Sequence, residues 1–193
     1  MKSKKIYILM GNPDKESTLS NELADTYEQH ARASGHEVRR ANISDMSFDP
    51  ILHKGYKVIQ ELEPDLKTAV DDLKWADHFV LVYPLWWSAT PALLKGFFDR
   101  AWLPGFFFHF HKNGPGWDRL MKGKTARVVA LSKMPPLAIR FMFGDFTNEI
   151  RHATLGFAGY KVRMTEFGNS ENLSERQRQR VHKAVARLAK KAV

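Results

Sequence analysis

The feature that most constrains the fold of this chain is a regular alternation of apolar, β-rich runs with amphipathic, helix-like segments. The strand-like runs cover residues 4–10, 36–43, 77–84, 125–132 and 161–167. The helix-like segments cover residues 17–34, 64–76, 91–102 and 145–156, together with the basic C-terminal segment. Strands that alternate with helices predict a parallel, doubly wound sheet with helices on both faces. We therefore expect a three-layer α/β fold with a five-stranded parallel sheet.

The whole chain is expected to form one domain. Its 193 residues are enough to bury a full core, and no linker-like change of composition or repeat divides residues 1–193. The run 77–84 is apolar almost throughout, as in a central parallel strand that is covered on both faces. Pro64 is placed to open a helix, and Ser174 with Gln177 predicts a capping box at the start of the last helix.

The net charge of +9 makes anionic partners a class to consider. Much of the excess lies in the C-terminal segment SERQRQRVHKAVARLAKKAV (174–193), where apolar residues at helical spacing form a stripe between Arg and Lys side chains. We interpret this segment as the solvated face of an amphipathic helix and not as a nucleic-acid surface, because no aromatic side chain lies there to stack on bases. No nucleic-acid partner is expected.

The chain has no cysteine, which excludes disulfides and thiolate chemistry and agrees with a reducing cytoplasm. The apolar run from Ile6 to Met10 is too short for a signal-peptide core or a membrane span. His109 and His111 stand two apart, but neither a partnered carboxylate nor further histidines accompany them, so we expect no metal site there. These patterns predict a cytoplasmic protein that is not inserted into a membrane.

In doubly wound sheets, ligands bind beyond the carboxyl ends of the strands. The segments that follow the predicted strands in this way are residues 11–18, 84–90 and 132–136. In the first of them, Ser17 and Thr18 stand at a helix start, where hydroxyl and free N–H groups bind a phosphate. Plain N-capping by Ser17 accounts for the same residues, so this segment alone leaves both readings open.

The second segment places Trp86 and Trp87 side by side in a short turn before Pro91, which stands near the first position of a helix. Adjacent residues point in different directions, so at most one of the two rings can belong to the core. The other ring suits a flat heteroaromatic ligand held by main-chain groups, and closure of a core or of a subunit interface is the alternative. In the third segment, Lys133 could face an anion, but we interpret it as a solvated lysine.

Five segments follow one another along the chain in a specific order: GNPDKES, DPILHKGY, WADHFVLVYPLWW, TPALLKGFFDRAWLPGFFF and GWDRLMKGKTA. Together they resemble the flavodoxin-like NAD(P)H dehydrogenase (quinone) family, which includes quinone reductases and ancillary flavoproteins of bacterial potassium-efflux systems. The similarity spans nearly the whole chain. It implies a flavodoxin-like fold and an FMN- or FAD-dependent NAD(P)H oxidoreductase that acts on quinones or related aromatic acceptors.

The resemblance also implies three loops around a flavin. Around the flavin phosphate it places Asn12, Ser17, Thr18 and Leu19. Against the flavin ring it places Pro84, Leu85, Trp86, Trp87 and Ser88. The third loop corresponds to Ser132, Lys133, Met134, Pro135 and Pro136. FMN is expected rather than FAD. The chain is short, and the region after Ser132 is shorter than the loop with which larger relatives cover an adenine.

For the acceptor pocket the resemblance leads to Trp87, Phe107, Phe108 and Phe143. Phe143 opens the sequence FGD, where the relatives have HGD, and the tyrosine and histidine familiar near the flavin of quinone reductases are absent. No catalytic side chain is therefore assigned. Hydride transfer is expected to depend on the flavin, with backbone N–H groups stabilising its reduced form and with ping-pong kinetics.

The stretch LPGFFFHF (103–110) is too apolar to leave in water, and such patches usually mark interfaces. We expect a homodimer in which each pocket is lined by both subunits, as the resemblance also implies. The alternative function is a regulatory flavoprotein subunit of a cation-efflux system, bound to a membrane-transporter partner. A charge of +9 argues against a flavodoxin-like electron carrier, because flavodoxins are usually acidic.

Overall fold

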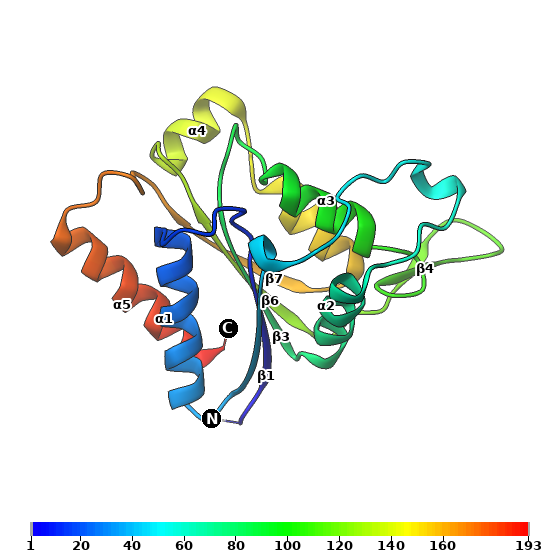
Figure 1. Cartoon of the computed structure of the whole chain (residues 1–193), viewed down its shortest axis with the longest axis horizontal. Coiled ribbons are helices and arrows are strands. Elements are labelled where there is room, and N and C mark those ends of the chain that lie inside the picture. Colours follow the sequence, from blue (N-terminus) through cyan, green and yellow to red (C-terminus); the bar gives the residue numbers. More distant parts are fainter. Residues whose placement is uncertain (1, 193) are drawn as a thin grey trace.

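Five parallel strands form the central layer, in the order β2-β1-β3-β6-β7 (Figure 1). The computed structural model describes residues 2–192. The strands are β1 (Lys5–Met10), β2 (Glu37–Asn42), β3 (His78–Pro84), β6 (Thr125–Leu131) and β7 (Lys161–Phe167). All four neighbouring pairs run parallel. The predicted doubly wound, five-stranded parallel sheet is confirmed.

Helices cover both faces of the sheet, as Figure 1 shows. One face packs against α1 (Leu19–Ala33) and α5 (Glu175–Lys191). The other packs against α2 (Pro64–Trp75), α3 (Ala92–Ala101) and the π-helix η3 (Glu149–Gly156). A further helix, α4 (Pro136–Phe143), follows β6, and two 3-10 turns, η1 (Ile43–Asp45) and η2 (Gly55–Lys57), lie between β2 and α2. No helix among residues 2–192 is both long and apolar enough to cross a bilayer.

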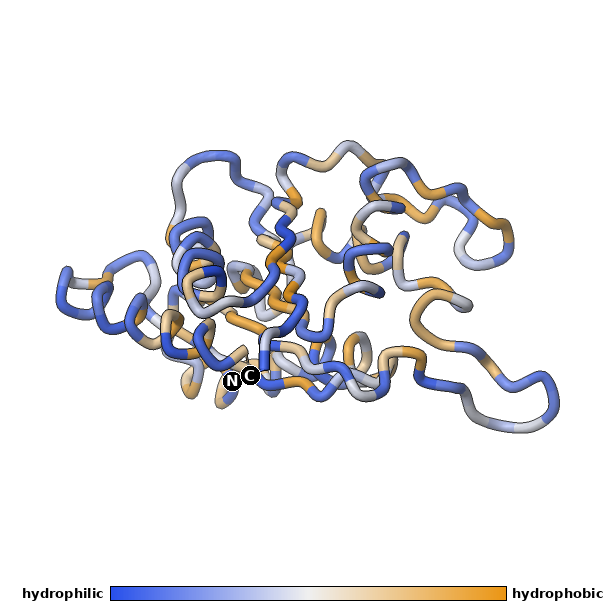
Figure 2. Tube along the Cα trace, turned by 90° about the horizontal axis from the view of Figure 1, so that it is seen from below, coloured by the Kyte–Doolittle hydropathy of each residue, from blue (hydrophilic) through white to orange (hydrophobic). Residues whose placement is uncertain are grey.

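The central strand β3 explains why the two helix layers are held together. Its side chains alternate, so Val80 and Val82 pack toward α1 and α5 while Phe79 and Leu81 pack toward α2 and α3. All four are fully buried. Burial of an apolar side chain of this size stabilises a fold by about 1.5–3 kcal/mol. Hydrophobic stretches accordingly run along the centre of the molecule in Figure 2, with hydrophilic stretches on the outer helices.

Several predicted boundaries shift in the structure. The first helix begins at Leu19 and not at Ser17, because Thr18 is its N-cap and accepts a bond from the backbone N–H of Asn21. The segment predicted as an aromatic loop contains a hairpin of β4 (Phe108–Phe110) and β5 (Trp117–Arg119). The Pro-Pro segment predicted as a turn opens α4, with Pro136 as its first residue. The capping box of Ser174 and Gln177 is confirmed.

The aromatic stretch 103–110 is packed differently from the prediction. Phe107 is fully buried and stacks on Trp102, with ring centroids 3.9 Å apart and an interplanar angle of 6°. Phe108 is nearly as deeply buried and contacts Phe157 edge to face. The expectation that Phe107 and Phe108 lie on an exposed interface is therefore wrong for this chain, because the hairpin folds them back onto α3 and η3.

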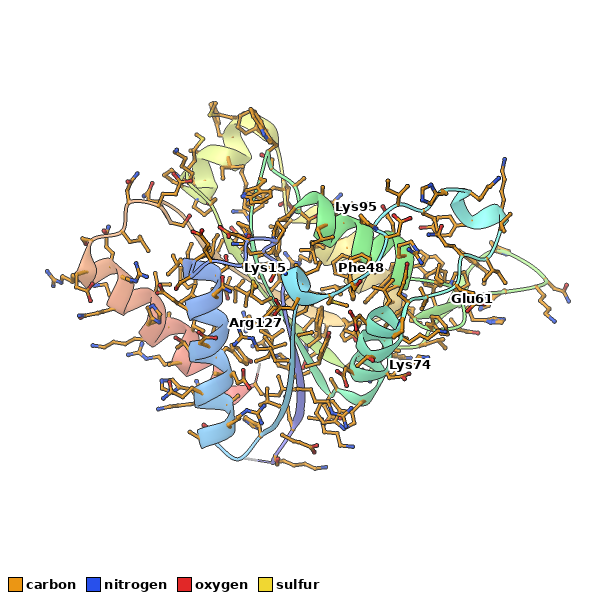
Figure 3. The ribbon with its side chains drawn as sticks, viewed as in Figure 1. Lys15, Phe48, Glu61, Lys74, Lys95 and Arg127 are labelled. Atoms are coloured by element: carbon orange, nitrogen blue, oxygen red, sulfur yellow. The ribbon has the colours of Figure 1, made fainter. Side chains whose placement is uncertain are left out.

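The long connection between β2 and α2 is anchored on α3. Arg100 is fully buried and donates to both carboxylate oxygens of Glu63, at 3.1 and 2.9 Å. It also donates to the backbone carbonyl oxygens of Asp49 and Glu61. Phe48, labelled in Figure 3, packs edge-on against a ring of α3 on the same side of the sheet. A buried guanidinium that satisfies backbone carbonyls in this way fixes the connection without regular secondary structure.

His78 at the start of β3 is buried in the neutral form. Its Nε2 lies 3.1 Å from the Tyr27 hydroxyl, and its Nδ1 lies 2.7 Å from Oγ1 of Thr125. Burial, with a smaller contribution from neighbouring positive charges, lowers the pKa of His78 from 6.5 to about 3. Between these values the unfolded chain binds a proton on His78 that the folded chain does not bind, so acid favours unfolding.

We predict that the free energy of unfolding decreases by about 1.4 kcal/mol for each pH unit below the unfolded pKa of His78. Urea unfolding at about pH 7 and about pH 5 measures this loss. His78→Gln retains hydrogen-bonding groups but cannot gain the proton, so its stability should depend less on pH. His152→Gln, at an exposed histidine, is the control and should keep the wild-type dependence. The same dependence in all three proteins would contradict the assignment.

Candidate functional site

The carboxyl ends of β1, β3 and β6 bring the three predicted loops to one edge of the sheet. The backbone N–H of Gly11 donates to the carbonyl oxygen of Val82 at 2.7 Å, which joins the first loop to β3. The N–H of Leu85 donates to the carbonyl oxygen of Leu131 at 2.6 Å, which joins the second loop to β6. Main-chain hydrogen bonds therefore fix the order and spacing of the loops.

The loop after β1 is organised by Asn12. This side chain is buried, donates to Oγ1 of Thr18 at 3.1 Å, and accepts from the backbone N–H of Asp14 at 3.1 Å. Thr18 then caps α1, while Ser17 is exposed. The first N–H groups of a helix have no partner within it, and the helix dipole adds positive potential there. The start of α1, at Leu19 and Ser20, thus has the chemistry that binds a phosphate.

The loop after β3 is a tight turn. Trp86 and Ala89 exchange two backbone hydrogen bonds, at 3.1 and 2.9 Å. Between them Trp87 has φ 51° and Ser88 has φ 60°, the left-handed pattern of a type I′ turn. Such residues cost about 1–3 kcal/mol each unless the surroundings impose them, and they cluster at binding sites. The turn leaves the Trp87 side chain fully exposed and Trp86 half-exposed.

The loop after β6 is held by the end of β7. Ser132 is buried, its N–H donates to the Phe167 carbonyl oxygen at 2.9 Å, and its hydroxyl donates to the Met134 carbonyl oxygen at 2.7 Å. Lys133 forms an ion pair with Glu171 at 2.9 Å. Both side chains are largely exposed, so this pair contributes little to stability. The prediction that Lys133 is a solvated lysine is confirmed, and Glu171 is its ion-pair partner.

A cavity of about 310 Å³ lies between the loops that follow β3 and β6. Its lining consists of Pro84, Leu85, Trp86, Trp87, Leu131, Lys133, Ser170 and Glu171. Five of these residues were predicted as flavin contacts from the sequence. Ser170 and Glu171 follow β7 and lie outside the three predicted ligand loops, so the sequence did not predict them. The sequence signal for them was Gly168-Asn169 directly after a strand, a turn in which Asn169 has φ 55°.

Other predicted residues lie apart from this cavity. Asn12, Ser17, Thr18 and Leu19 belong to the neighbouring loop and do not line it. Phe107 cannot line any open pocket, because it is fully buried. Phe108 contributes to a second cavity of about 310 Å³, between α3 and η3, and only Trp87 and Phe143 of the four predicted acceptor residues remain exposed at this end of the sheet.

Helix α4 lies at this end of the sheet (Figure 1). Arg140 donates to both oxygens of Glu166, at 2.7 and 2.6 Å, and this bidentate pair ties α4 to β7. Hydrogen bonds from Thr147 lower the pKa of Asp145 at the start of the following loop. Only Ile139 of α4 is buried. The helix leaves four large apolar side chains exposed, those of Leu137, Phe141, Met142 and Phe143.

Ionisable groups at this edge offer little acid–base chemistry. Burial raises the pKa of Tyr83 at the end of β3, which keeps its phenol neutral. Glu149, on the η3 side, also has a raised pKa because it is partly buried. Among residues 2–192, no group of three or more His, Asp or Glu side chains is placed to hold a metal ion. The site instead offers ring faces, backbone groups and a helix N-terminus.

Comparison of the chain with known protein families and structures agrees with this geometry. The Flavodoxin_2 family model, which describes a flavodoxin-like fold, matches residues 4–192. The chain belongs to this family. It is 29% identical over 140 residues to the uncharacterized NAD(P)H oxidoreductase YcaK of Escherichia coli (strain K12), which covers 68% of this chain and 71% of that protein.

A second relative is human ribosyldihydronicotinamide dehydrogenase (quinone). It is 32% identical over 117 residues, which cover 57% of this chain and 48% of the human protein. The chain thus spans about half the length of that relative. The structure of an FMN-dependent NADH-azoreductase from Bacillus anthracis str. Ames Ancestor, in complex with FMN, superposes with a TM-score of 0.77 at 17% identity, and covers 96% of this chain and 97% of that one. At this identity the likeness shows a shared fold.

We predict that Gly168→Ala disturbs the loop after β6. A Cβ at Gly168 would lie 2.7 Å from Cδ of Pro136, 2.8 Å from Cα of Pro135 and 2.9 Å from the Met134 carbonyl oxygen. Two prolines cannot yield easily, so the free energy of unfolding should fall by about 1–3 kcal/mol. Urea unfolding measures the change, with Ser170→Ala in the same segment as the control. A loss no larger than that of the control would contradict the prediction.

Proposed function

We propose that this protein is a flavin-dependent oxidoreductase that transfers a hydride from NAD(P)H, through FMN, to quinones or related aromatic acceptors. Membership of the family supports an enzyme of the NAD(P)H:quinone oxidoreductase type, as do the relatives named as an NAD(P)H oxidoreductase and as a quinone dehydrogenase. One observation carries the proposal. An open cavity with tryptophan walls and a capped helix N-terminus stand at the ends of adjacent strands.

The residues at this edge fit the two ends of FMN. For the ring, Trp87 offers an exposed aromatic face beside a cavity with apolar and main-chain walls. For the phosphate, the 15-residue helix α1 offers its first N–H groups together with the hydroxyls of Ser17 and Thr18. The proposed flavin contacts are Asn12, Ser17, Thr18, Leu19, Pro84, Leu85, Trp86, Trp87, Ser88, Ser132, Lys133, Met134 and Pro135.

When bound, a flavin supplies the redox chemistry, because it accepts a hydride from NAD(P)H and passes it to an acceptor. This chain's residues would bind and orient the reactants. The two hydrogen bonds between Trp86 and Ala89 constrain the backbone of the turn, from which the Trp87 side chain projects. The bonds of Ser132 fix the opposite wall in the same way. Preorganised groups of this kind need no titrating side chain to favour a reaction.

We propose that Trp87 and Phe143 form the acceptor side of the site. Both side chains are exposed at the carboxyl end of the sheet, and flat aromatic acceptors gain by stacking on such rings. The nicotinamide and the acceptor would use the same opening in turn, which produces ping-pong kinetics. Initial rates measured at several acceptor concentrations should give parallel double-reciprocal lines, whereas intersecting lines would contradict a shared opening.

We propose that the flavin is FMN rather than FAD. The helix after β6 is only eight residues long, and Gly168 holds the preceding loop close to β7. Within residues 2–192, the cavity lining contains no residue of α4, so this short region is not expected to cover an adenine. Mass spectrometry of the flavin released on denaturation distinguishes the two cofactors directly.

We also propose that the protein is a cytoplasmic homodimer, with an interface that differs from the predicted one. Exposed apolar side chains gather on the connection before α2, at Ile51, Tyr56, Val58 and Ile59. Tyr56 also lines the cavity between α3 and η3. Apolar patches of this kind usually mark an interface, and this patch replaces the buried Phe107 as the contact surface.

The decisive experiment is purification followed by an absorbance scan and an activity measurement. The protein should carry, or take up, a yellow chromophore that is released as FMN. With the flavin bound, it should oxidise NADH or NADPH faster when a soluble benzoquinone is added. A protein that binds no flavin after reconstitution would overturn the proposal.

We predict that Ser17→Asp weakens FMN binding by about tenfold or more, because two like charges near the helix start repel. Ser17 makes no capping bond to α1, so the substitution should leave the fold intact. Ser17→Asn has the same shape without the charge and should bind nearly as wild type. Titration of apoprotein with FMN, followed by the quenching of flavin fluorescence, measures both. Equal affinities for the two variants would remove Ser17 from the phosphate site.

A further inference from the structure

The exposed face of α5 carries a straight row of positive charges. Five basic residues follow at alternating intervals of four and three: Arg176, Arg180, Lys183, Arg187 and Lys190. This spacing places them on one side of an α-helix, along about 21 Å of its length. All five are exposed, and α5 is hydrophilic along most of its length in Figure 2.

These charges are not neutralised by the protein itself. Within residues 2–192, none of the five has a carboxylate within ion-pair distance. Arg178, on the adjacent side of the helix, in contrast forms an ion pair with Glu22 of α1, and Nε2 of His182 lies 3.4 Å from the same carboxylate. The only acidic residue of α5 is Glu175 in its first turn. The row is therefore distinct from the face that binds α1.

The edge strand β7 extends this basic surface. Val162 and Met164 pack into the core on the α2 and α3 side, whereas Phe167 packs on the α5 side. Side chains alternate along a strand, so Lys161 and Arg163 lie on the α5 side of the sheet. Both are exposed. Cations from two elements thus lie on the same side of the sheet.

Most of the row lies on a packed part of α5. Val181, Val185 and Ala189 are buried against the sheet, so the helix is packed from Val181 onward, whereas no residue of its first six is buried. The packed part cannot enter a DNA major groove, which is about as wide as one helix. The row also lacks an aromatic side chain that would stack on single-stranded bases. A flat, densely anionic surface complements it best.

We propose that the α5 row is a docking surface for the anionic face of a lipid bilayer. Charge complementarity carries this assignment, because basic side chains on an exposed helix are attracted to acidic phospholipid headgroups. The inference rests on the proposed function in one respect, since quinones concentrate in membranes and docking would bring the enzyme to them. The row starts next to the segment of Ser170 and Glu171, which lines the cavity.

The test is sedimentation of the purified, flavin-loaded protein with phosphatidylcholine vesicles, with and without phosphatidylglycerol. We expect binding only to the anionic vesicles and a loss of binding as salt is raised. Lys183→Glu with Arg187→Glu should lower the partition coefficient by about 25-fold or more, at about fivefold for each cation removed.

The matched control is Lys112→Glu with Lys67→Glu, at two exposed lysines of the β4–β5 hairpin and of α2, which pack on the face of the sheet opposite α5. Both variants change the net charge by −4, from +9 to +5. The control should retain most of the binding, because the row and not the total charge is responsible. An equal loss in both variants, equal binding to neutral vesicles, or retention of duplex DNA without vesicle binding would overturn the inference.

Reduction of a soluble quinone by the same preparations separates the two proposals. Turnover in solution without vesicle binding would overturn the docking surface and leave the enzyme activity standing. Vesicle binding that depends on the row, without any quinone turnover, would support the docking surface and contradict the proposed acceptor.

Discussion

The structure depends on the parallel pairing of β1, β3 and β6. Parallel strands share a direction, so the three chain segments that leave them emerge at one edge, and their relative heights are set by the register. The bonds from Gly11 to Val82 and from Leu85 to Leu131 continue that register past the last strand residues. The candidate site is therefore positioned by the most buried part of the core, and its loops inherit the rigidity of the sheet.

At the candidate site, the backbone adopts conformations that its residues do not favour on their own. Trp87 and Ser88 adopt left-handed backbone angles that asparagine or glycine would adopt more easily, and the turn persists because Trp86 and Ala89 close it. Gly168 is the opposite case, since glycine is required there for the close approach of Pro135 and Pro136. The stability of the fold does not require a tryptophan in a strained turn next to a contact that depends on glycine, so these features point to a binding site.

The sequence was sufficient to predict the sheet, because apolar, β-branched runs such as 77–84 have few alternatives. It predicted two of the three cavity walls through the Trp-Trp turn and the loop at Ser132. The sequence did not predict features whose structure is determined by tertiary contacts. Pro136 marks a helix start as well as a turn, so α4 was missed, and the burial of Phe107 depends on a hairpin too short to show a pattern. Ser170 and Glu171 reach the cavity only because β7 pairs with β6.

The exposed apolar face of α4 has a consequence for how the protein responds to temperature. Covering Leu137, Phe141 and Met142 releases water from apolar surface, and this gain is entropic near room temperature and weakens on cooling. Any association through α4 should therefore strengthen as a solution is warmed. Attraction through the cations of α5 follows ionic strength instead. Contacts through these two surfaces would therefore be loosened separately, those of α4 by cold and those of α5 by salt.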